Sequence, residues 1–161
     1  MRTPGPGPQA GIVLVALLLA MMFSAVLAMA AAESWATSVR HEREAELLYA
    51  GQQYRLAIRS YYLGAPRGQA RVLPAQLEDL LDDKRYTVPM HHLRRLYPDP
   101  ITGSANWGLV QVGDRISGVY SPSEAKPLKQ AGFDPAEALF EGRESYKDWA
   151  FVFTPPAIRR R

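Results

Sequence analysis

Residues 12–32, IVLVALLLAMMFSAVLAMAAA, are the stretch that decides the fold. They carry no charge and a single hydroxyl, that of Ser24, and no proline interrupts them. Because a helix rises about 1.5 Å per residue, this run is long enough to span the hydrocarbon core of a bilayer, roughly 30 Å thick. Residues 33–62, ESWATSVRHEREAELLYAGQQYRLAIRSYY, also have helical character. The sequence therefore predicts one helix of about fifty residues, with its first half in lipid and its second half in water.

The remainder of the chain is long enough for one modest domain. The protein has 161 residues, and about 125 of them follow the apolar stretch, enough for one core and not for two. Lys and Arg number 19 and Asp and Glu 16, which gives a formal net charge of +3. This mild excess bears on solubility and surface affinity rather than on fold. The chain has no cysteine, which excludes disulfides, thiol catalysis and cysteine-ligated zinc.

Composition divides the chain into five segments. Residues 1–11, MRTPGPGPQAG, are rich in Pro and Gly, and we expect them to be an irregular leader. Residues 12–32 form the transmembrane half of the long helix, and residues 33–63 form its soluble half. Residues 64–154 are predicted to form a small α+β globular domain, and residues 155–161 form a basic tail.

Beyond the lipid segment the helix becomes amphipathic. One stripe recurs at spacings of four and three, which predicts a face that packs on a domain; its members are Leu47, Gly51, Tyr54, Ile58 and Tyr61. Trp35 lies just past the apolar run, where an indole anchors at a membrane interface. We expect Glu42, Glu44 and Glu46 to lie on the wet face, where Arg40 pairs with Glu44 and Arg43 with Glu46.

The globular segment combines short helices with strands. A short helix is predicted from Pro74 through Leu81, and one helical turn at Pro135–Phe140. Three segments have strand character: Asn106–Val112, Arg115–Ser121 and Trp149–Thr154. Gly113-Asp114 between the first two is a short hairpin signal. The aromatic side chains are assigned to the core between helix and sheet: Tyr54, Tyr61, Tyr62, Trp107 and Trp149.

In this order the chain resembles type IV pilin-like proteins, specifically the pseudopilins of the type II secretion system. The resemblance rests on the leader that ends at Gly11, on the apolar run that starts at Ile12, and on three later stretches. These are RHEREAELLYAGQQYRLAIRSYY (40–62), VLPAQLEDLL (72–81) and RRLYPDPITGSANWGLV (94–110). Together the five features cover most of residues 11–121.

The resemblance implies a fold, a location and a set of partners. The fold is one long N-terminal helix packed through its second half on a small antiparallel sheet. The prepilin peptidase would cut after Gly11 and methylate Ile12. The protein would be a single-pass inner-membrane subunit with its C-terminal domain in the periplasm. Its partners would be other pseudopilins, contacted through the N-terminal helix, together with the secretion machinery of the inner membrane and the lipid bilayer. No enzyme activity, cofactor or nucleic acid is expected.

One departure from the family concerns the fifth mature position, which is Ala16 here. The family has a Glu there, which pairs with the N-terminal amine of a neighbouring subunit. Without it nothing in the segment neutralises a buried amine, which favours a tip, initiating or accessory role, or a relative that does not polymerise. We assign the lateral helix contacts to small residues that recur every four positions: Ala16, Ala20, Ser24 and Ala28.

A second departure concerns metal. Major pseudopilins have an Asp- and Gly-rich calcium loop, and the corresponding residues 118–140 hold only Glu124, Asp134 and Glu137. Calcium takes six to eight oxygen ligands, so we predict no metal site there.

Several alternatives compete with these assignments. Ala28-Met29-Ala30 matches a signal-peptidase site, and cleavage after Ala30 would release a secreted or periplasmic binding domain. The apolar run is longer than the roughly 7–15 residues of a signal core, which favours a retained helix. The charges near the ends of the run do not set its orientation.

Two further groups of residues invite sharper hypotheses. His91-His92 with Arg94-Arg95 could form a patch for nucleic acid or anionic lipid. We favour a solvated loop whose arginines meet the acidic residues Glu78, Asp79, Asp82 and Asp83. Ser104 and Ser121 lie in no nucleophile-elbow motif, so neither is expected to be catalytic.

Overall fold

The computed structural model describes residues 8–156. The first seven residues of the expected leader and the last five of the basic tail lie outside the described residues, as do the side chains of residues 8–10 and 30–34. The chain divides into two compact units, Met1–Arg40 and His41–Arg161, and each is described by itself.

The predicted long helix is confirmed. Helix α1 runs from Pro8 to Leu63, and Gly64 follows it as expected. The expectation that the whole of residues 1–11 is irregular is wrong for residues 8–11, which are helical. Proline is compatible with a first helical turn because the N–H groups there have no intrahelical acceptor.

In the first unit, α1 exposes an apolar surface. Gly11–Met29 is a stretch of 19 residues with a mean hydropathy of 2.8, and none of it is buried. It is long and apolar enough to cross a membrane, by length and composition.

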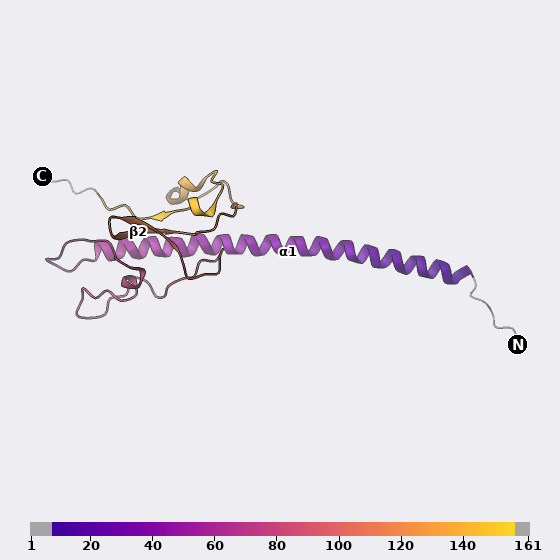
Figure 1. Cartoon of the computed structure of the whole chain (residues 1–161), viewed down its shortest axis with the longest axis horizontal. Coiled ribbons are helices and arrows are strands. Elements are labelled where there is room, and N and C mark those ends of the chain that lie inside the picture. Colours follow the sequence, from indigo (N-terminus) through magenta and orange to yellow (C-terminus); the bar gives the residue numbers. More distant parts are fainter. Residues whose placement is uncertain (1–7, 157–161) are drawn as a thin grey trace. The chain divides into compact units, whose positions relative to one another are not determined.

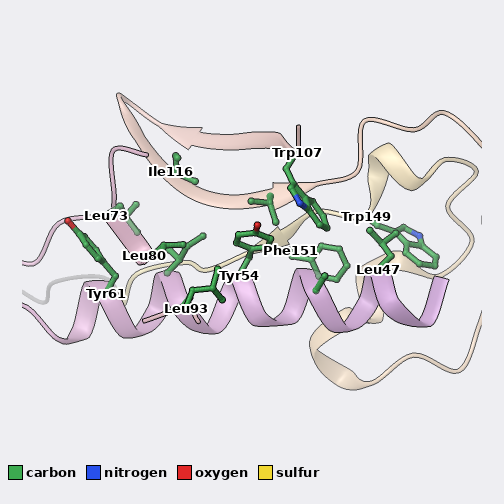
Figure 2. Packing of buried hydrophobic residues seen from close by; sticks show 14 of the residues in the cluster. Leu47, Tyr54, Tyr61, Leu73, Leu80, Leu93, Trp107, Ile116, Trp149 and Phe151 are labelled. Carbon is green, nitrogen blue, oxygen red and sulfur yellow. The ribbon is translucent and has the colours of Figure 1, made fainter. Parts of the chain in front are cut away.

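In the second unit, the rest of the chain folds along the later part of α1 (Figure 1). This part of the helix carries the core. The predicted stripe is confirmed, since Leu47, Tyr54, Ile58 and Tyr61 are each at most 5% exposed and Gly51 is buried. Figure 2 shows Tyr54 between the helix and Trp107 of the sheet side, and Trp149 beside Leu47. All five aromatic side chains assigned to the core are buried.

A small antiparallel sheet covers this stripe. Its strands are β1 (Gly108–Val112), β2 (Arg115–Tyr120) and β3 (Phe151–Val152), in the order β1-β2-β3. The predicted hairpin is confirmed: Val112 pairs with Arg115 across Gly113-Asp114. Gly113 has φ +64°, a value that a tight hairpin turn favours at its first central residue. A bulge lies between Val110 and Gln111.

The third strand is shorter than predicted. It begins at Phe151 rather than at Trp149, because the 3₁₀ helix η3 (Tyr146–Asp148) uses the N–H of Trp149, which donates to the Tyr146 carbonyl. The ring of Phe151 lies directly against Gly51 of α1, and a Cβ at Gly51 would overlap it. Strand and helix therefore meet at a glycine.

The short helices are of 3₁₀ type. The predicted turn at Pro135–Phe140 is confirmed as η2. The helix predicted from Pro74 starts later, as η1 (Leu77–Leu80), because the carboxylate of Asp79 accepts the N–H groups of Ala75 and Gln76 and so caps the helix there. One N-terminal helix and a three-stranded antiparallel sheet give the described residues an α+β layout.

Candidate functional site

The first candidate surface is the apolar part of α1. The small residues assigned to helix packing, Ala16, Ala20, Ser24 and Ala28, are all exposed. Gly11 is also exposed, and Ile12 and Trp35 are 71% and 75% exposed. A shallow apolar hollow of about 360 Å³ lies along the start of this surface, lined by Gly11, Ile12, Val15, Ala16 and Leu19. The small side chains thus leave room where another helix could pack closely.

In the second unit, a buried carboxylate replaces part of the predicted wet face. Glu44 is 3% exposed, so the prediction that it pairs with Arg40 in water is wrong. Its Oε2 accepts the N–H of Leu128 at 2.9 Å and the hydroxyl of Tyr146 at 2.9 Å, and its Oε1 accepts the N–H of Lys129 at 2.7 Å. These three donors replace the water that the carboxylate loses, and their hydrogen bonds offset the desolvation cost of burying the charge.

A second buried carboxylate, on η2, pairs with a side chain of α1. Glu137 of η2 is 7% exposed and lies 2.5 Å from the guanidinium of Arg55, which also donates to the Ala136 carbonyl at 3.1 Å. Glu44 and Glu137 therefore fix the irregular stretch between β2 and β3 to α1 from two points.

A third carboxylate closes the turn before β1. Asp99 is fully buried and accepts from the Ile101 N–H, the Thr102 hydroxyl and the Ser121 hydroxyl at 2.7–3.0 Å. This turn therefore ties the Asp-Pro segment to the end of β2. Ser121 donates to a carboxylate here and so has a structural partner.

The fourth carboxylate, Asp83, corrects the expectation about the basic loop. Arg94 and Arg95 were expected to meet the acidic face, but Asp83 is bound by Arg85 at 2.6 Å and by His92 at 3.2 Å. Burial raises the pKa of Asp83, but the hydrogen bonds from Arg85 and His92 outweigh burial and hold the pKa below its ordinary value. The guanidinium of Arg85 also lies 3.6 Å from the centre of the Tyr61 ring and donates to the Tyr61 carbonyl.

Ser60, His92 and Asp83 contact one another in the order of a serine-histidine-aspartate catalytic triad. His92 Nδ1 lies 2.8 Å from Ser60 Oγ, and its Nε2 lies 3.2 Å from Asp83 Oδ2. A serine nucleophile also needs donors for an oxyanion. Ser60 lies in the last turn of α1, where backbone N–H groups are used by the helix itself. The arrangement is better explained as a clamp that holds the His92 segment to α1.

The residues considered for metal are dispersed. Glu124 lies 3.6 Å from Lys147, Asp134 precedes η2, and Glu137 is bound by Arg55. Within residues 8–156, no group of three or more His, Asp or Glu side chains is placed to hold an ion.

Sequence reasoning missed the burial of Glu44 because the partners of this carboxylate are distant in the chain. Glu44 meets donors that are 84, 85 and 102 residues away. The local signal was an acid three residues before a stripe that is otherwise apolar, and helical spacing places position 44 next to Leu47 and Gly51. That spacing could have indicated the inward orientation.

No known protein family, curated protein or solved structure matches the chain.

Proposed function

We propose that the protein is a non-enzymatic, single-pass inner-membrane subunit of pseudopilin type. Its α+β unit would lie in the periplasm, and the subunit would contribute to a pseudopilus that drives type II secretion or to a related pilus assembly. One observation carries the proposal: the 19 residues Gly11–Met29 are helical and strongly apolar, and none of them is buried. A surface of this kind needs lipid or other apolar helices around it.

The second unit supports the same function. Its core is built on α1 itself, so a helix that carries an apolar surface in its first unit also carries a folded domain in its second. Such a chain suits a subunit that is held by its helix and presents its domain to water. The proposed orientation and class of machine rest on the order of leader, apolar run and Asp-Pro turn, in which the chain resembles the pseudopilins.

The apolar hollow at Ala16 refines the role. In place of an acid, this position offers a recess among Ile12, Val15 and Leu19. A partner helix would fill the recess with an apolar side chain, without a charge contact to its amine. We therefore place the subunit at the tip of the filament or in an accessory position.

Processing of the N-terminus tests the proposal. The full chain is expressed with a prepilin peptidase and extracted from membranes, and its intact mass and N-terminal sequence are determined. We expect a chain that starts at methylated Ile12. Gly11→Asp should block cleavage, whereas Gly7→Asp is the matched control and should leave it unchanged. A start at Ala31 would support a released binding domain instead, and an uncleaved Met1 would also contradict the proposal.

Crosslinking tests the assembly face. Because the chain has no cysteine, single cysteine variants report one position each. We expect Ala20→Cys to crosslink to a cysteine in the helix of a co-expressed pseudopilin. Leu18 lies about 200° around the helix from Ala20, so Leu18→Cys should crosslink far less. Equal yields at the two positions would show that no defined face is used.

A further inference from the structure

A polar cleft lies beside α1 in the second unit. It has a volume of about 540 Å³, and its lining includes Tyr49 and Gln53 of α1 together with His91, Arg94 and Tyr97. This volume falls in the range of about 300–1,000 Å³ that is typical of ligand sites. None of these residues belongs to the apolar surface that carries the proposed function.

The walls of the cleft are fixed before any ligand arrives. The N–H groups of His92 and Leu93 both donate to the Leu80 carbonyl at 2.9 Å. The His92 side chain is held between Ser60 and Asp83. His91 Nδ1 donates to the Leu81 carbonyl. A preformed site loses little conformational entropy on binding.

The cleft is rich in unused donors. Among the described residues, the side chains of Arg94 and Gln53 form no hydrogen bond or ion pair, and both line the cleft. Arg95 lies beside it, with its guanidinium 5.1 Å from the centre of the Tyr97 ring. The hydrogen bond with Tyr97 raises the pKa of the Tyr49 hydroxyl, whereas the cations Arg94 and Arg95 act on it in the opposite direction. These two cations attract an anion to this end of the cleft.

The shape and chemistry favour a peptide over a small ion. Tyr49 and Tyr97 meet edge to face with ring centres 6.0 Å apart and offer flat apolar surface to side-chain methylene groups. The Gln53 amide can donate to and accept from a peptide backbone. The Arg94 guanidinium matches a carboxylate in a bidentate pair.

The geometry points to this cleft as a binding site for a short acidic segment of a partner polypeptide, in which an Asp or Glu carboxylate pairs with Arg94. The inference does not rest on the proposed function, because it concerns the second unit alone. An acidic segment of a secreted protein and one of another subunit would bind in the same way.

Fluorescence anisotropy tests the inference on the full chain in a neutral detergent. The probe is a labelled, end-blocked peptide Gly-Glu-Glu-Glu-Glu-Gly, and its control replaces each Glu with Gln. We expect saturable binding of the Glu peptide that is at least tenfold tighter than binding of the Gln peptide. Arg94→Gln should weaken it at least tenfold and Gln53→Ala about threefold, whereas Arg71→Gln removes an equal charge from an exposed position outside the cleft and should have little effect.

Three results would overturn the inference. Equal binding of the two peptides would show that carboxylates are not recognised. Equal losses for Arg94→Gln and Arg71→Gln would show diffuse charge attraction in place of a site. Competition by inorganic phosphate at the concentration of the peptide would assign the cleft to small anions. Because Arg94 is exposed, its substitution leaves the core intact, and circular dichroism of each variant verifies this.

Discussion

Substitution of Glu44 by Gln should destabilise the second unit more than any other conservative change on α1. The carboxylate receives three hydrogen bonds, from Leu128, Lys129 and Tyr146. In the Gln variant the amide oxygen can still accept from Leu128 and Tyr146, which share one carboxylate oxygen in the native protein. The NH₂ group then faces the N–H of Lys129, which is also a donor. One charge-assisted bond is lost, at about 1.5–3 kcal/mol, and the other two weaken.

We therefore expect Glu44→Gln to lower the free energy of unfolding by about 2–4 kcal/mol. Tyr146→Phe removes one of the three charge-assisted bonds and should cost about 1.5–3 kcal/mol. The double variant should lose less than the sum of the two, because both changes act on the same carboxylate.

The assay is urea denaturation of the full chain in detergent, followed by tryptophan fluorescence, to which Trp149, fully buried next to Tyr146, contributes. Glu46→Gln is the matched control, since Glu46 is exposed on the same helix, and it should change stability by less than about 0.5 kcal/mol. If Glu44→Gln behaved like Glu46→Gln, the carboxylate would not hold the later segment, and the reasoning would be refuted.

Three further predictions concern stability. The folded pKa of Asp83 is lowered, so its contribution is present above its ordinary pKa of 3.8 and is lost as pH falls through the folded value; acid denaturation curves of Asp83→Asn should lack this loss. Burial raises the pKa of Tyr54 to about 12, so stability should fall as pH rises above the ordinary value of 10.0, and Tyr54→Phe should remove that dependence in alkaline unfolding curves. Gly51→Ala places a Cβ on the Phe151 ring and should cost about 1–3 kcal/mol in the same urea assay, whereas a neutral outcome would mean that the strand can shift.

Local patterns predicted most of the secondary structure. The period of the stripe from Leu47 to Tyr61 identified the buried face of α1, and Gly113-Asp114 identified the hairpin. Each of these signals lies within a few residues, so no knowledge of the rest of the fold is needed to interpret it.

Each error has its cause in a hydrogen bond that the hydrophobic pattern does not encode. Asp79 captured the N–H groups that a helix from Pro74 would have placed in its first turn. The segment before Phe151 entered η3 and not the sheet. Glu44 turned inward because donors from a distant segment could solvate it. The pattern of apolar residues shows neither the local bonds at Asp79 and Trp149 nor the distant donors of Glu44.

The cleft beside Tyr49 was partly visible in the sequence. His91-His92 and Arg94-Arg95 were recognised as a basic group, but the sequence could not show that Tyr49 and Gln53 lie opposite them. Nor could it show that the acidic neighbour Asp83 is already bound by Arg85. Because Arg85 already binds Asp83, Arg94 does not pair with that carboxylate.

The distance in sequence between Glu44 and its donors also has a consequence for biosynthesis. The hydroxyl that completes the Glu44 site belongs to a residue 102 positions later, and Trp149 and Phe151, which fill the core, come later still. Until the ribosome has produced those residues, Trp149 and Phe151 do not cover the stripe near Leu47 and Gly51, and the carboxylate lacks its third donor. A nascent chain that stops before them would present an open apolar helix to proteases and chaperones. The core of the second unit therefore closes only after the segment that ends at Phe151 has been made.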